Sequence, residues 1–419
     1  MTVRSLSAAS SGIDIMQTDL DTIGNDIANS ESDGFKSGTA EFEDLLTEQL
    51  QPAGAATGVS QASTNPSAIG AGAEVSAIAT NFSEGPVTQT GVSSNVAIEG
   101  NGFLAVSQNG QTVYTRDGDL QIDTNGHLAT NSGGLVLGWA PNQPTTSVPG
   151  PLSIITGSAE PPAQTANIDL GGNLPSTATS PVTVTATLYD SLGNTVPATL
   201  TFTPTGTAGS WTLQGTVPGA ATTLWNAPQT LVFSSTGQLQ SLNGTAVGTG
   251  TTTLAIGTPP SNYNWTGAAP QLDFPPVGSQ NAVTQFAANQ TIAVTDQDGY
   301  AAGTLQSYSI GSDGVISGTY SNGESQTLGT IALANFANPQ GLDDQGNTYF
   351  TATAASGNAQ LGAPGQSGLG TLQGGAVEGS NVDLATELTD LIEAQTAYQA
   401  NTKVVDSSST ALQSLVEMS

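Results

Sequence analysis

The chain has 419 residues, of which 33 are acidic and only four are basic, so its formal net charge is −29. This length is enough for two or three domains with hydrophobic cores. The charge argues against nucleic acid and against an anionic membrane surface as partners, because both are bound by clustered Lys and Arg. There is no cysteine, so disulfides and thiolate metal sites are excluded.

No window of eighteen apolar residues occurs, and polar residues interrupt the first twenty positions throughout. We therefore expect neither a membrane-spanning helix nor a cleavable secretory signal.

The N-terminal segment has apolar residues at alternating spacings of three and four. This heptad pattern predicts a helix that ends before the turn-forming stretch 29–34, with a seam that must be buried. The seam residues are Leu6, Ala9, Ile13, Met16, Leu20, Ile23 and Ile27. The residues that follow Lys36 offer no second helix, so the partner has to come from elsewhere.

The matching helix is predicted at the other end of the chain. Residues 382–417 contain no Gly or Pro, and Ser380 or Asn381 could cap the helix. Its heptad positions are Leu384, Leu388, Leu391, Tyr398, Val405, Leu412 and Val416. A second apolar stripe lies on an adjacent face. Such helices either close a simple intramolecular hairpin or, as we favour, complete their burial against other copies of the chain.

The segments between the helices are predicted to be strands joined by tight turns. Turn signals recur at Asn109-Gly110, Asp117-Gly118, Asn125-Gly126, Asp313-Gly314 and Asn322-Gly323. Residues 182–204 alternate between apolar and polar side chains, which predicts a half-buried strand leading into a hairpin.

These patterns predict a mainly β protein with terminal α-helices, in which one β domain is inserted into another. Segments rich in Pro and Ala, 140–166 and 275–290, mark the boundaries of the insertion. The predicted parts are a terminal helical coiled-coil domain (1–30 and 372–419), a connecting segment (31–71), a discontinuous inner β domain (72–150 and 291–371) and an inserted outer β domain (151–290). Residues 51–74 are expected to be a linker or to become ordered only in an assembly.

No residue pattern points to catalysis, and we expect a non-enzymatic protein without cofactor or metal. The single histidine, His127, follows the Asn125-Gly126 turn and is interpreted as an exposed loop residue rather than a metal ligand. No glycine-rich loop is followed by a helix with Lys, and nothing singles out a catalytic pair among the carboxylates.

Three segments resemble the bacterial flagellar rod and hook proteins. They are "SGIDIMQTDLDTIGNDIANSESDGFK", "NVAIEGNGFLAVSQNGQTVYTRDGDLQIDTNGHLAT" and "SNVDLATELTDLIEAQTAYQANTKVVDSSSTALQSLV". In that family a helix ends in an Asn-x-x-Asn element and a Gly-aromatic-Lys step. The matching residues here are Asn25, Asn29, Gly34, Phe35 and Lys36.

The resemblance implies a structural subunit of a helical tube that is a universal joint between motor and filament. The inserted residues 151–290 favour a hook subunit over a distal rod protein. The implied partners are other copies of the chain, the rod, hook-cap and hook-filament junction proteins, and the flagellar export apparatus. The implied location is the extracellular hook on the basal body, reached without a cleavable signal.

Two alternatives stay open at this point. One is a distal-rod-type protein with an insertion, and the other is a secreted glycan-binding or carbohydrate-active β protein.

Because the charge of −29 would place many like charges close together in a polymer, acid or divalent cations are expected to favour polymerisation. The terminal helices are expected to be mostly disordered in the free monomer.

Overall fold

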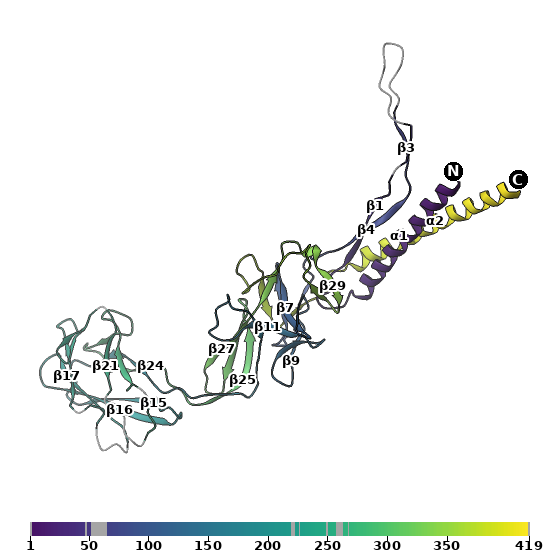
Figure 1. The fold of residues 1–419 in the computed structure, drawn as a ribbon. Coiled ribbons are helices and arrows are strands. Elements are labelled where there is room, and N and C mark those ends of the chain that lie inside the picture. The colour runs from purple at the N-terminus through teal and green to yellow at the C-terminus, as the bar shows by residue number, and fades with distance from the viewer. Residues whose placement is uncertain are drawn as a thin grey trace, which may run out of the picture. The chain divides into compact units, whose positions relative to one another are not determined.

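The computed structural model describes residues 2–46, 48–51, 65–218, 223–225, 227–248, 250–256, 263–266 and 268–417. The chain is mainly β with one long helix near each end, as the sequence predicted. It divides into two compact units (Figure 1). Unit 1 comprises Met1–Ile155, Tyr308–Gly318 and Thr327–Ser419, and unit 2 comprises Thr156–Ser307 and Thr319–Gln326.

The two terminal helices, α1 (Thr2–Ala28) and α2 (Leu384–Glu417), pack side by side within unit 1 (Figure 1). They are antiparallel, because Ser5 Oγ lies 3.2 Å from Ser408 Oγ while the residues after α1 lie near the start of α2. Gly12 is so close to Asn401 that a β-carbon at Gly12 would lie 2.7 Å from the amide nitrogen.

The start of α2 differs from the prediction. The N-cap is Asp383, whose Oδ1 accepts hydrogen bonds from the backbone N–H groups of Ala385 (2.9 Å) and Thr386 (3.4 Å). Neither Ser380 nor Asn381 caps the helix. Asn381 instead contacts the β part of unit 1, which is why a cap assigned from residue type alone falls two residues too early.

A two-stranded ribbon follows α1 and packs against it. Strand β1 (Gly38–Asp44) pairs with β4 (Ala73–Thr80), and β2 (Glu48–Gln51) pairs with β3 (Ser67–Ile69). The predicted connecting segment therefore contains three strands. The sequence predicts a linker over residues 51–74, and residues 52–64 of it lie outside the described residues. In the described remainder the linker prediction is wrong, because β3 and the start of β4 are found there.

The β part of unit 1 is built on an antiparallel sheet with the strand order β27-β11-β7-β8-β30-β29. These strands are β7 (Phe103–Gln108), β8 (Gln111–Thr115), β11 (Leu135–Trp139), β27 (Ser325–Ile331), β29 (Asp343–Gly346) and β30 (Tyr349–Thr351). Attached to them or beside them are β5 (Val87–Gln89), β6 (Val96–Glu99), β9 (Leu120–Ile122), β10 (Leu128–Thr130), β12 (Gly150–Pro151), β26 (Val315–Tyr320), β28 (Leu333–Asn335), η1 (Pro339–Gly341), β31 (Gln360–Gly362), β32 (Thr371–Gly374) and β33 (Ala376–Glu378). Its core contains Phe103, Trp139 and Phe350.

Most of the predicted turns are present. Asn109-Gly110 joins β7 to β8 with both residues at positive φ (52° and 83°), as a tight hairpin requires. Asp117-Gly118 is not a hairpin turn, because β9 pairs with β10 and not with β8. Gly118 is needed there for a different reason: a β-carbon would lie 1.6 Å from the carbonyl oxygen of Val96.

His127 is not an exposed loop residue. It is half-buried and forms a β-bridge with Ser153. Its ring Nδ1 is buried without a hydrogen-bond partner. The turn signal before it was correct, but the residue itself already belongs to the sheet.

Unit 2 is a β structure around one large hydrophobic core. One sheet has the order β15-β16-β17-β18-β19-β20, and another has β21-β22-β14-β23 with β24 beside β14. The strands are β13 (Ala159–Glu160), β14 (Asn167–Asn173), β15 (Val182–Tyr189), β16 (Thr195–Pro204), β17 (Ser210–Thr216), β18 (Gln229–Phe233), β19 (Leu239–Leu242), β20 (Thr245–Ala246), β21 (Thr252–Ala255), β22 (Gln271–Phe274), β23 (Val283–Thr284), β24 (Ala293–Gln297) and β25 (Gly303–Ile310). In β15 the apolar residues alternate into the core, and the strand forms the predicted hairpin with β16.

Candidate functional site: the roots and outer faces of the terminal helices

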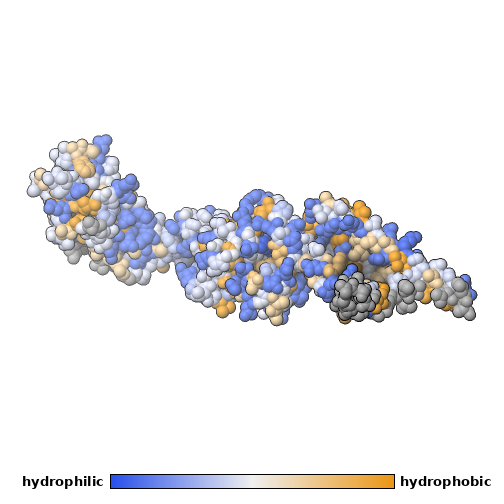
Figure 2. All heavy atoms as spheres, turned by 90° about the horizontal axis from the view of Figure 1, so that it is seen from above, coloured by the Kyte–Doolittle hydropathy of each residue, from blue (hydrophilic) through white to orange (hydrophobic). Residues whose placement is uncertain are grey.

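The terminal helices keep apolar side chains in contact with solvent although they already pack on each other. Ile392 is 62% exposed, and large exposed side chains continue along α2. The others are Leu384, Leu388, Val404 and Val416. Hydrophobic residues appear on the helical part of the surface in Figure 2. A row of exposed Leu, Ile and Val on a helix is a feature of protein–protein contacts.

The residues predicted to pack between subunits fall into three groups. Ile23 of α1 is buried. Half-buried positions are Leu6, Ile13, Met16, Leu20 and Ile27 on α1, and Leu391, Tyr398, Val405 and Leu412 on α2. Leu384 and Leu388 are exposed. Heptad analysis passed over Ile392, but the four-residue spacing of Leu384, Leu388 and Ile392 was the signal that could have found it.

The chain leaves α1 through an asparagine-rich turn. Asn29 donates from Nδ2 to the backbone oxygen of Asn25 (2.9 Å) and to its side-chain oxygen (3.1 Å). Gly34 then adopts φ +70°, and its N–H donates to the carbonyl of Glu378 (2.7 Å). A β-carbon at Gly34 would lie 2.4 Å from the backbone nitrogen of Asp117, so glycine is required by both space and backbone angle.

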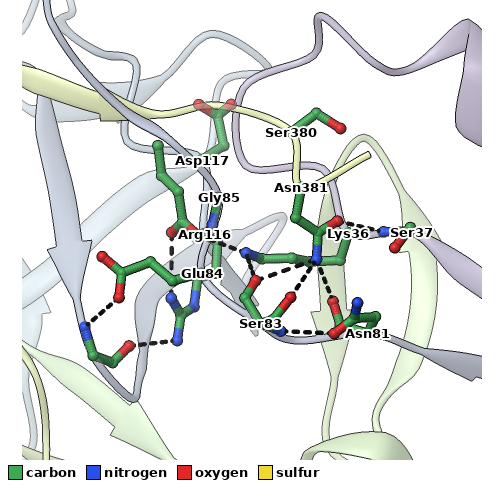
Figure 3. A network of polar contacts seen from close by, with 12 residues as sticks. Lys36, Ser37, Asn81, Ser83, Glu84, Gly85, Arg116, Asp117, Ser380 and Asn381 are labelled. Atoms are coloured by element: carbon green, nitrogen blue, oxygen red, sulfur yellow. Dashed lines mark hydrogen bonds and ion pairs between the residues drawn. The ribbon is translucent and has the colours of Figure 1, made fainter. Parts of the chain in front are cut away.

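A buried ion cluster joins the roots of both helices to the sheet (Figure 3). Lys36 follows the turn after α1, and Glu378 ends β33 just before α2. Lys36 Nζ lies 2.5 Å from Glu378 Oε1, with both side chains fully buried. Arg116, which follows β8, places Nη1 3.3 Å from Glu378 Oε2. One carboxylate thus binds two cations.

Backbone groups add further hydrogen bonds to the cluster. Lys36 Nζ donates to the carbonyl of Ser83 (2.7 Å), and Arg116 Nη2 donates to the carbonyl of Gly100 (2.7 Å). Gly85 N–H donates to Glu378 Oε1 (2.9 Å). Burial lowers the pKa of Lys36, and the neighbouring carboxylate of Glu378 opposes this shift. The shared carboxylate and these hydrogen bonds partly offset the cost of burying the three charges, and Arg116 Nε is buried without a hydrogen-bond partner.

Asn381 links the same roots by neutral hydrogen bonds. Its Oδ1 accepts from Ser37 N–H (2.8 Å), and its Nδ2 donates to the carbonyl of Asn81 (2.8 Å) (Figure 3). The residues after α1 and those before α2 are therefore held together by side chains from three separate parts of the sequence. Of the family-motif residues, Gly34 and Lys36 contact Glu378, whereas Asn25 and Asn29 bond to each other. All of these and Phe35 line one cavity of about 620 Å³.

The described residues contain no group of three or more His, Asp or Glu side chains placed to hold a metal ion. No helix among them is long and apolar enough to cross a membrane. What the arrangement provides is mechanical: two long paired helices, of which α2 has an exposed apolar row, anchored by one buried cluster.

Family models for flagellar proteins match most of the chain. The matches are "Flagellar hook protein FlgE/F/G D1 domain" over residues 97–186, "Flagellar basal body protein FlaE D2 domain" over 173–300 and "Flagellar basal body rod FlgEFG protein C-terminal" over 373–418. The solved structure of the flagellar hook protein FlgE2 of Helicobacter pylori is similar in fold, with a TM-score of 0.53 and 12% identity. That similarity covers 70% of this chain and all of the other.

Similarity to whole proteins extends from end to end. The flagellar hook protein FlgE of Salmonella typhimurium is 35% identical over 99% of this chain and 100% of its own length. The flagellar hook protein FlgE of Borreliella burgdorferi is 34% identical over 99% of both chains. With this identity along the full length, the chain belongs to the flagellar hook protein family and is a structural subunit of the hook.

Proposed function

We propose that the subunit polymerises into a curved helical tube by burying the outer faces of its terminal helices against neighbouring copies. The single observation that carries this is the row of Leu384, Leu388 and Ile392, which stays exposed after α1 and α2 have paired. An intramolecular hairpin leaves that row in water, whereas burial of an apolar side chain gains about 1.5–3 kcal/mol each. A polymer repeats the gain at every subunit.

The tube would be the universal joint of the flagellum, and the chain would have no catalytic activity. We propose that the outer β domain (151–290) is inserted into the inner one (72–150 and 291–371), which is supported by the two compact units of the chain. Small domains joined by linkers can shift against neighbours as a tube bends. Rod, hook-cap and hook-filament junction proteins would bind its ends, and the flagellar export apparatus would deliver the chain without a cleavable signal.

The test is assembly of full-length protein carrying Leu388→Asp and Leu391→Asp. We expect folded, soluble subunits that form no tubes, because charges replace the apolar contacts. Gln111→Asp, at an exposed position of β8, is the control and should assemble like the parent. Sedimentation and negative-stain electron microscopy report the polymer, and circular dichroism reports the fold. Tubes formed by the double variant would refute the proposal.

Deleting residues 1–30 or 380–419 tests the same idea more coarsely. Assembly should be lost while the β core stays folded. If either deletion left tubes intact, the helices would not be the polymerising elements.

A further inference from the structure

The contact between α1 and α2 near their roots includes several carboxylates. A cavity of about 360 Å³ there is lined by Asp19 from α1 and by Glu387, Asp390 and Glu393 from α2. Beside it lies Asp26, seven residues after Asp19 and so on the same face of α1. Apolar residues line the same cavity, so these carboxylates border the apolar contact of the two helices. They are Met16, Ile23, Ala394 and Ala397.

Asp26 is the most buried of these groups, with 1% of its surface exposed. Both carboxylate oxygens accept from one backbone donor, Gly38 N–H at the start of β1, at 3.2 and 3.0 Å. One neutral N–H is weak compensation for a buried negative charge, which ordinarily requires a cation.

The charged groups around Asp26 are acidic on every packed element. After desolvation, the charges of Asp26, Asp390, Asp19 and Asp383 raise the pKa of Glu387 further. On the ribbon, β1 and β4 add only exposed carboxylates, and the cavity residues of β1 are Gly38 and Thr39. The nearby cation Lys36 is already bound by Glu378. The acidic residues of the ribbon are Glu41, Glu43, Asp44 and Glu74.

We propose that the Asp26–Glu387 region is a proton-dependent clasp, which holds the roots of the two helices together when it binds protons and loosens them when both carboxylates are ionised. The protonated groups can hydrogen-bond across the gap, whereas ionised groups repel one another within a Debye length of about 8 Å. Protons rather than a metal would be the ligand, since the described residues provide no metal-binding group.

The direction of the pH response follows from the burial. Desolvation raises the pKa of Asp26 from 3.8 to about 6. Desolvation, with Asp390 as a second cause, raises the pKa of Asp19, and desolvation followed by Asp26 raises that of Glu387. Between the ordinary and the raised pKa values of these carboxyl groups, the closed helix pair binds more protons than the separated helices. Lowering the pH through the raised pKa values therefore stabilises the closed pair.

The test measures the distance between the helices by pulsed electron resonance on dilute, monomeric, full-length protein. Because the chain has no cysteine, spin labels attach only at introduced Gly24→Cys and Thr389→Cys, both exposed near the roots. We expect a short, narrow distance distribution at pH 4.5 and a longer or broader one at pH 7.5, with the change centred near pH 6. The disorder expected for the terminal helices of the free monomer then applies to the ionised state at pH 7.5. Asp26→Asn should give the narrow distribution at both pH values.

Asp21→Asn removes the same charge from an exposed position of α1 and should behave like the parent. Glu387→Gln is the second variant, in case Asp26→Asn weakens α1 itself, and it should narrow the distribution at pH 7.5. The proposal is overturned if the parent has the same distribution at both pH values, or if neither neutral variant changes the response. Because the monomer is measured, failure here leaves the proposed polymerisation untouched.

Discussion

Lys36 and Glu378 are 342 positions apart in the sequence, and their charged atoms lie 2.5 Å apart in a fully buried contact. The contact joins the segment that leaves α1 to the segment that enters α2. Whatever load either helix carries therefore reaches the same point of the β structure.

Glu378→Gln is expected to destabilise unit 1 by about 3–5 kcal/mol, because Lys36 and Arg116 would become buried cations without a counter-charge. Glu99→Gln, exposed at the end of β6, is the matched control and should change little. Calorimetric unfolding of the full chain measures both. Equal unfolding temperatures for the two variants would show that the cluster contributes no stability.

Two glycine-to-alanine changes should have opposite effects. Gly34→Ala forces a left-handed residue to carry a β-carbon against Asp117, and the backbone angle alone costs about 1–2 kcal/mol. Gly24→Ala lies in α1 with nothing within 4 Å of the new carbon, and should stabilise the helix by up to about 1 kcal/mol. Urea unfolding compares them, and a stable Gly34→Ala protein would contradict the strained turn.

Ile392→Asp and Ala394→Asp separate the two faces of α2. Ile392 is 62% exposed, so its variant should lose assembly while the helix pair persists. Ala394 is 3% exposed in the contact with α1, so its variant should lose the helix pair as well. Sedimentation and helical circular dichroism distinguish these outcomes. Normal tubes from Ile392→Asp would remove this position from the interface.

Acid should stabilise the β part of unit 1 through Asp117. Burial raises the pKa of Asp117 from 3.8 to about 6, with Asp119 and Asp33 as further acidic neighbours. The folded state thus binds more protons than the unfolded chain in this window, and its stability increases as the pH falls from 7.5 to 5. After allowance for solvent screening, we expect about 1–2 kcal/mol.

Asp117→Asn should remove that part of the pH response while keeping the acceptor for Asp119 N–H. Asp313→Asn is the control, since Asp313 also accepts a backbone N–H two residues onward but is exposed. Thermal unfolding at pH 7.5 and 5 gives the comparison. The assignment is wrong if both variants keep the parent's pH dependence.

Periodic features could be predicted from the sequence, and isolated ones could not. The heptads of both helices and the alternation of β15 repeat one physical requirement several times, so each was evident in the residues. Lys36, Arg116 and Glu378 are single charges whose partners lie hundreds of positions away, and no local pattern pairs them. The scarcity of cations was the available signal, because the chain has only four Lys and Arg residues. A cation that lies next to an apolar segment in the sequence can be expected to pair with a carboxylate.

The cap of α2 and the role of Gly118 show the same limit. Ser380, Asn381 and Asp383 are all good capping residues, and only the contacts of Asn381 with Ser37 and Asn81 decide among them. Asp117-Gly118 has the residue types of a hairpin turn, but the glycine is required because the carbonyl oxygen of Val96 lies too close for a β-carbon.

The antiparallel pairing of α1 with α2 also sets the order in which the subunit can fold. Each helix finds its partner at the opposite end of the chain, so the loop that must close is nearly the whole protein, and such non-local contacts form late. A chain that emerges from a narrow passage, whichever end leads, holds one unpaired helix until the last residues are released. In the proposed export and assembly, the surface that recruits the next subunit would thus be completed only when translocation is finished.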